Sequence, residues 1–140
     1  MATISPGKKA QRTARWARIM TKWLVTFSHR DGARWQVVNF NGPQGFESAG
    51  IVDLLAIRKD HRSNKPGLKR GDFFEIVLIQ VKGGFAARPS SQDVVRLAQV
   101  AKHYHPKVVV LAEWQRKQTL ALFKLDKLQW KPVDPSIVFS

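Results

Sequence analysis

The sequence predicts an α/β fold in which a mixed central sheet is flanked by helices. Two stretches, residues 16–27 and 90–103, repeat apolar side chains at the spacing of one helix face. Near-continuous apolar runs of strand length lie between and after them, which is typical of strands buried on both faces. With 140 residues, the chain suits a single domain, residues 1–140, built around one core.

The first predicted helix covers residues 16–27 and follows a flexible basic lead-in at residues 1–10. Its apolar side chains share one face, which we expect to pack in the core: Trp16, Ile19, Met20, Trp23, Leu24 and Phe27. Basic side chains occupy much of the remaining surface: Arg12, Arg15, Arg18 and Lys22. These cations either contact phosphates or are solvated, and the sequence leaves both interpretations open.

The predicted strands are rich in β-branched and aromatic residues or form continuous apolar runs. They are residues 34–40, 51–57, 73–82 and 107–112. A polar loop at residues 58–72 joins the second strand to the third. The second helix, residues 90–103, has Ser90 or Ser91 available as its N-cap, and Asp93 in the first turn suits the helix dipole.

The last part of the sequence has weaker secondary-structure signals. Residues 118–124 and 127–131 indicate either a final edge hairpin or one strand and a tail. Two prolines are expected to end regular structure, which leaves a C-terminal tail at residues 132–140. The apolar segment 137–139 in this tail could mediate a homodimer, or it could cover the core of its own domain.

The charge of the chain indicates its class of partner. It has 24 Lys and Arg against 10 Asp and Glu, a net charge of +14. Such a surface attracts polyanions, of which nucleic acid is the commonest. Acidic membrane surfaces and acidic proteins are less favoured partners, and a generally basic protein without any polyanion partner is the alternative.

The composition also excludes several kinds of chemistry. With no cysteine, the chain cannot form disulfides, thiolate zinc sites or a Cys nucleophile, which fits a reducing cytoplasm. No apolar run is long enough to cross a bilayer, and no signal peptide is recognisable, so we expect no membrane partner. Gly83 and Gly84 lack the spacing of a phosphate-binding loop, so we expect no nucleotide cofactor.

Three polar residues interrupt the buried strands, where a polar side chain is costly unless it is paired or functional. They are Asp53, Gln80 and Lys82. Gln80 and Lys82 point to the same face of their strand, and Asp53 can join them if the two strands are neighbours. The alternative is structural: Lys82 extends to solvent at a strand end, and Gln80 bonds to the backbone.

These residue types suit a Mg²⁺ site, for which Mn²⁺ could substitute. Mg²⁺ prefers hard oxygen ligands, and one or two carboxylates with water and substrate phosphate often suffice. Asp53 would supply the carboxylate, Gln80 its side-chain oxygen and Val81 its main-chain carbonyl. Lys82 would orient the attacking water or stabilise charge in the transition state, and with a lowered pKa it would act as the base.

This pattern resembles the signature of the PD-(D/E)XK nuclease superfamily: an Asp on one strand, a loop, and a strand that ends in acid-x-Lys. It is most similar to the Holliday-junction-resolvase-like and Mrr-like branches, over about residues 46–114, with residues 16–27 as the first core helix. The resemblance implies a restriction-endonuclease-like αβββαβ core. It also implies that Asp53 and Gln80 bind the metal and that Lys82 assists the attacking water. Gln99 would be an additional polar contact.

The chain departs from that pattern at three places. Val52 stands where the family name has Pro, and Gln80 stands where Asp or Glu is usual, which removes one negative charge from the metal site. Resolvase-like members also carry a Glu in the first helix, and this helix has none. Glu47 is the best local substitute, and Glu75 is less suitable because its strand parity is opposite to that of Gln80.

The expected function is that of a Mg²⁺-dependent endonuclease that hydrolyses DNA with structure-guided or weakly sequence-specific cutting. Duplex, branched and single-stranded DNA are all open as substrates, and so is RNA. The alternative is a non-catalytic nucleic-acid-binding module on a decayed nuclease fold, and a toxin or defence nuclease is a third reading. Phosphate contacts are expected from the basic residues outside the first helix: Arg58, Lys59, Arg62, Lys69, Arg70 and Arg88.

Overall fold

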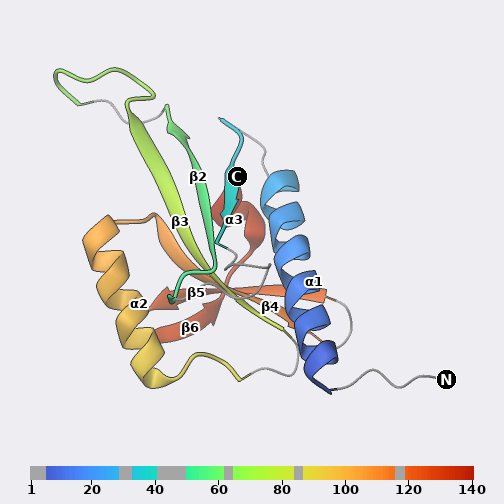
Figure 1. Cartoon of the computed structure of the whole chain (residues 1–140). Helices are drawn as coiled ribbons and strands as arrows, with labels where there is room; N and C mark the ends of the chain where they lie inside the picture. Colours follow the sequence, from blue (N-terminus) through green and yellow to red (C-terminus); the bar gives the residue numbers. More distant parts are fainter. Residues whose placement is uncertain (1–5, 29–32, 41–49, 62–64, 84–86, 116–118) are drawn as a thin grey trace.

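A computed structural model of the chain describes residues 6–28, 33–40, 50–61, 65–83, 87–115 and 119–140, with side chains from residue 15 onward. Within these ranges one six-stranded sheet is packed by helices (Figure 1). The helices are α1 (Pro6–Phe27), α2 (Ser91–Tyr104) and α3 (Pro135–Phe139). The strands are β1 (Gln36–Asn39), β2 (Leu54–Asp60), β3 (Phe73–Lys82), β4 (Val108–Gln115), β5 (Thr119–Asp126) and β6 (Gln129–Pro132). The predicted α/β class and mixed sheet are confirmed.

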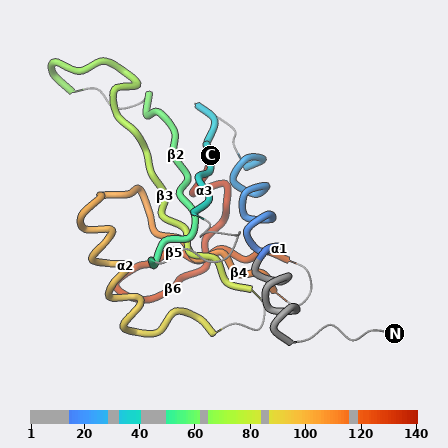
Figure 2. Tube along the Cα trace, in the orientation of Figure 1, coloured from blue at the N-terminus to red at the C-terminus, as the bar shows by residue number. Residues whose placement is uncertain are grey.

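The strands of the sheet lie in the order in which they follow one another along the chain. Among the described strands, β3 and β4 run parallel and the other neighbouring pairs run antiparallel. A parallel pair needs a long crossover connection, and α2 lies within it. Apolar packing places α1 and α3 on one face of the sheet and α2 on the other, as the ribbon and the Cα trace both show (Figures 1 and 2).

The face of α1 that packs on the sheet differs from the expected one. Among its side chains from residue 15 onward, Ala17, Thr21 and Val25 are fully buried, while Trp23 is 58% and Phe27 is 73% exposed. Small side chains let the helix approach the sheet closely, and the Thr21 hydroxyl donates to the Ala17 carbonyl at 2.6 Å, which satisfies it inside the core. The expected core stripe is therefore wrong for its exposed members: Trp16, Ile19, Trp23 and Phe27.

The first helix also begins earlier than expected. It starts at Pro6 and includes residues 6–10, which were assigned to a flexible lead-in. Proline suits the first turn of a helix, where its missing N–H has no intrahelical partner to lose. In the part of the chain that the structure describes, no helix combines the length and apolarity needed to span a bilayer.

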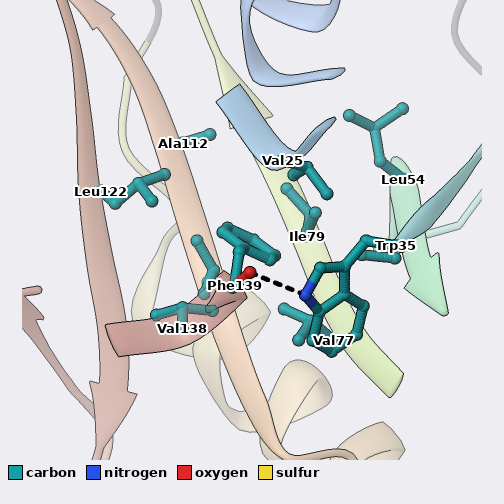
Figure 3. Packing of buried hydrophobic residues seen from close by; sticks show 11 residues of the cluster. Val25, Trp35, Leu54, Val77, Ile79, Ala112, Leu122, Val138 and Phe139 are labelled. Atoms are coloured by element: carbon teal, nitrogen blue, oxygen red, sulfur yellow. Dashed lines mark hydrogen bonds between the residues drawn. The ribbon is translucent and has the colours of Figure 1, made fainter. Parts of the chain in front are cut away.

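The C-terminal segment closes the core and is not a tail. Asp134 caps α3 by accepting from the Ser136 N–H at 2.8 Å. Phe139 is fully buried, its ring meets Trp35 edge-on, and its carbonyl accepts from Trp35 Nε1 at 2.9 Å (Figure 3). Val138 is also buried, while Ile137 is exposed. Of the two expected roles for this segment, covering its own core is the one observed.

The second strand is displaced along the chain from its expected position. It begins at Leu54, so that Asp53 lies directly before the strand and not inside it. The strand then continues through Arg58, which was assigned to the polar loop. Arg58 is buried beside Glu75, 3.2 Å away on β3, and its guanidinium lies over the Trp35 ring. Pairing with Glu75 explains how a charged residue continues the strand.

Three local predictions are confirmed. The strand β3 has the expected bounds. Ser90 caps α2 in a reciprocal capping box with Asp93. The segment after β4 is a hairpin, because Lys127 and Leu128 turn the chain with positive φ values of 49° and 64°.

Candidate active site

Asp53 joins the start of β2 to the end of β3. Its N–H donates to the Ile79 carbonyl at 3.0 Å, and its Oδ2 accepts from the Val81 N–H at 2.8 Å. These two contacts lie on either side of Gln80. The expected meeting of Asp53 with the strand that carries Gln80 and Lys82 is therefore observed. Val81, whose carbonyl was expected to bind the metal, contacts Asp53 through its main-chain N–H.

Gln80 presents a buried oxygen at this place. Its Oε1 atom is buried and has no hydrogen-bond partner among the described residues. Burying an unpaired amide oxygen costs about 1–3 kcal/mol. A backbone bond to this oxygen, which was the structural alternative, is not observed. The oxygen keeps its lone pairs available to a cation or a donor.

Lys82 lies on the same face of β3 as Gln80. The residues between and before them, Val81 and Ile79, pack toward α1, so Gln80 and Lys82 face the α2 side. The Lys82 side chain is only 10% exposed, and its Nζ lies 3.8 Å from Glu113 Oε2. The ammonium is thus held at the sheet and does not extend into solvent as the structural alternative predicts.

Glu113 is the site residue that sequence reasoning missed. It lies on β4, directly opposite Lys82 in the parallel register. Arg88 holds it from the other side, with Nε 3.0 Å from Oε2 and the guanidinium over the Phe123 ring at 4.4 Å. The available signal was a strand continuing past Ala112, because Glu113 then shares the parity of the buried Leu111.

Arg18 was expected either on phosphates or in solvent, and it lies instead in the site. Its Nη2 is 3.4 Å from Asp53 Oδ1, and its Nη1 donates to Asn39 Oδ1 at 2.9 Å. Both partners of the ion pair are largely buried, since their side chains are 12% and 15% exposed. The negative charge of Asp53 is therefore already partly balanced, and a metal ion on Oδ1 would compete with Arg18.

The residues present fit a weakly held Mg²⁺ site. Asp53 offers a carboxylate and Gln80 an unpaired amide oxygen, and both are the hard ligands that Mg²⁺ prefers. No group of three or more His, Asp or Glu that could hold a metal ion occurs within the described ranges. Of the expected carboxylate ligands, the structure describes Asp53 alone, and a site of this kind leaves most coordination positions to water or phosphate oxygens. Glu47, the expected additional ligand, lies outside the described residues.

The expected phosphate contacts divide into several groups. Arg58 is buried in its ion pair with Glu75, which corrects its place in a phosphate-gripping loop. Arg88 is held by Glu113 and Phe123 at the site. Five of the expected phosphate-contact cations are exposed, as is Gln99 on α2. These cations are Arg15, Lys22, Lys59, Lys69 and Arg70. Arg62 and the side chain of Arg12 lie outside the description.

The loop between β2 and β3 lies at the other end of these strands from Asp53 (Figure 1). The seven residues of β2 separate the two ends by about 20 Å. That distance corresponds to about six base-pair steps of duplex DNA. The exposed Lys69 and Arg70 therefore lie too far from Asp53 to flank a phosphate held there.

No protein-family model matches the chain, and no curated protein is detectably similar to it. Its function has to be inferred from its own residues and surface.

Proposed function

We propose that this chain is a Mg²⁺-dependent endonuclease that hydrolyses DNA phosphodiester bonds with structure-guided or weakly sequence-specific cutting. One observation carries the proposal: Asp53 is bonded to the backbone on both sides of Gln80, two residues before Lys82. A carboxylate, an unpaired amide oxygen and an ammonium group thus come from adjacent segments at one end of two strands. Hard oxygen ligands can hold a divalent metal for phosphodiester hydrolysis, and an ammonium group can stabilise the charge that develops on the phosphate.

The arrangement of the elements supports a restriction-endonuclease-like core of the PD-(D/E)XK type. The order α1-β1-β2-β3-α2-β4, with β3 parallel to β4, corresponds to the αβββαβ core that the resemblance implies. The two strands that carry Asp53 and Lys82 are direct neighbours. Glu113 occupies the position beside them on β4, where it holds Lys82.

Each residue has a distinct part in the reaction. Asp53 and Gln80 would hold the Mg²⁺, which when bound polarises the scissile phosphate and lowers the pKa of a coordinated water. Lys82 would stabilise the negative charge that develops on the phosphate oxygens in the transition state. Glu113 keeps the Lys82 ammonium in place. Arg18 keeps Asp53 oriented and, on leaving Oδ1, would be free to bind a substrate phosphate.

The proposal is tested with supercoiled plasmid, linear duplex and a four-way junction, each incubated with Mg²⁺, with Mn²⁺ and with EDTA. The control is Lys82→Ala, purified in the same way. We expect cutting that needs a divalent metal and that is lost in Lys82→Ala, because the charge on the transition state is then unbalanced. Cutting that persists in EDTA or in Lys82→Ala would refute the proposed site.

A second function is favoured by one observation, the contact between Arg18 and Asp53. Because Arg18 partly neutralises Asp53, the carboxylate proposed to hold the metal, the chain could be a non-catalytic nucleic-acid-binding module. Such a module would cut none of these substrates with either metal, and in a mobility-shift assay it would bind DNA tightly with strong salt dependence.

A further inference from the structure

The surface of α1 that faces away from the sheet carries an exposed array of rings and cations. We call it the α1 outer face, and its members are Arg15, Trp16, Ile19, Lys22, Trp23 and Phe27. All of them are exposed, and the rings of Trp23 and Phe27 lie 5.4 Å apart. All four apolar members of this face were expected in the core, and the burial of Ala17, Thr21 and Val25 on the opposite side leaves them outside.

The α1 outer face has two parallel columns. Trp16, Trp23 and Phe27 follow one another at intervals of about one or two helical turns and span about 16 Å along the axis. Arg15 and Lys22 form the second column, with Ile19 between the two. Lys22 also lines an open hollow together with Ile19, Trp23, Thr26 and Phe27. A row of rings and a row of cations thus run side by side along the helix.

We propose that the α1 outer face binds single-stranded nucleic acid, with unpaired bases stacked on Trp16, Trp23 and Phe27 and phosphates paired with Arg15 and Lys22. Aromatic platforms beside a basic track bind single strands without sequence preference, because every base has a π-face. Bases in a duplex are already stacked on one another and cannot use such a platform. The inference rests on the proposed function only in identifying the bound strand as the strand that is cut.

The position of the basic column supports this occupant. Arg18, which contacts Asp53 at 3.4 Å, lies one turn from both Arg15 and Lys22 on the same helix. A strand that follows the column therefore passes directly beside the candidate active site. Unpaired nucleotides next to a junction or a frayed end would be held there, while the exposed Lys69 and Arg70 reach duplex farther away.

Charge disfavours a second copy of the chain as the occupant. A two-fold contact through this face would bring Arg15 and Lys22 of both copies into one interface. Residues 6–28 contain no acidic residue to compensate them. A single-stranded nucleic acid, in contrast, has bases that can stack on the rings and phosphates that can pair with the cations of this face. An anionic lipid surface shares this charge chemistry, and the test separates it from nucleic acid.

Binding is measured in EDTA, so that cleavage plays no part, by the fluorescence anisotropy of a labelled oligothymidylate. An abasic strand of the same length and a matched duplex are the comparison ligands. We expect Trp23→Ala to raise the Kd for oligothymidylate about tenfold or more and to leave the Kd for the abasic strand unchanged. Trp23→Phe keeps a stacking ring and should restore most of the affinity. Lys22→Gln should lower the slope of log Kd against log salt by about 0.7.

Tyr104→Ala is the matched control, since Tyr104 on α2 is 59% exposed and Trp23 is 58% exposed. The inference is overturned if Trp23→Ala and Tyr104→Ala bind oligothymidylate equally well. It is also overturned if Trp23→Ala dissociates a dimer in sedimentation, or abolishes binding to anionic vesicles without weakening oligothymidylate binding. If Trp23→Ala weakens oligothymidylate binding but the unmodified protein cleaves no DNA with either Mg²⁺ or Mn²⁺, the proposed nuclease is refuted and this inference stands.

Discussion

At the scale of single residues, the ion pairs decide what each charged side chain can do. Lys82 and Arg88 converge on Glu113, and Arg18 meets Asp53, so that these five charges are held by ion pairs at one end of the sheet. Arg58 is used differently, because its pair with Glu75 is buried between strands. A cation in such a pair positions its neighbour, whereas a solvated cation is available to an anionic partner.

The pair of Lys82 and Glu113 gives a direct prediction. Glu113→Gln removes the charge beside Lys82 while keeping the side-chain volume. We expect kcat for DNA cleavage to fall by on the order of 100-fold, because the ammonium loses its fixed position, while KM changes little. Steady-state kinetics on plasmid DNA measures both. The control is Asp126→Asn, which removes a carboxylate from the exposed pair with Lys131. An unchanged kcat in Glu113→Gln would remove Glu113 from the site.

At the scale of elements, close approach determines which helix face is buried. The apolar spacing on α1 predicts that a stripe of large side chains packs on the sheet. The face that packs there instead carries the smaller residues Ala17, Thr21 and Val25. A helix with small contact residues lies nearer the strands and buries more of their surface. The large rings of Trp23 and Phe27 are then left for another partner.

This packing predicts opposite outcomes for two neighbouring substitutions. Ala17→Leu should lower the free energy of unfolding by about 1–3 kcal/mol, because the contact with the sheet has no room for added atoms. Trp16→Ala, at a half-exposed position, should change it by less than about 0.5 kcal/mol. Urea denaturation followed by circular dichroism measures both. A larger loss in Trp16→Ala would mean that the expected stripe is the packed face after all.

At the scale of the whole molecule, segments from opposite ends of the chain complete one core. Val25 of α1, Trp35 before β1 and Phe139 of α3 belong to the same cluster of buried side chains (Figure 3). The candidate site lies at one end of β2 and β3, and the loop with Lys69 and Arg70 lies at the other (Figure 1). Cations thus lie at both ends of these strands, and the net charge of +14 favours the approach of a polyanion.

The closing role of α3 is testable through stability. Phe139→Ala should lower the free energy of unfolding by about 3–5 kcal/mol, because it leaves a cavity against Trp35. Ile137→Ala, two residues away and exposed, should change it by less than about 0.5 kcal/mol. If Ile137→Ala is the more destabilising variant and its effect grows with protein concentration, the segment serves a dimer contact instead.

By itself, the sequence determined the α/β class, the bounds of β3, the cap of α2, the final hairpin and the approach of Asp53 to the strand that carries Gln80 and Lys82. These features follow from the spacing of apolar residues, from helix-capping residues and from the alternation of side chains along a strand. Each of these signals depends on residues close together in the sequence. Tertiary structure alone decided that Arg18 lies on Asp53, that Glu113 lies beside Lys82 and that α1 turns its rings outward. Each of these depends on strand register or on how closely a helix approaches the sheet. Such distances arise between residues far apart in the chain, and local patterns do not encode them.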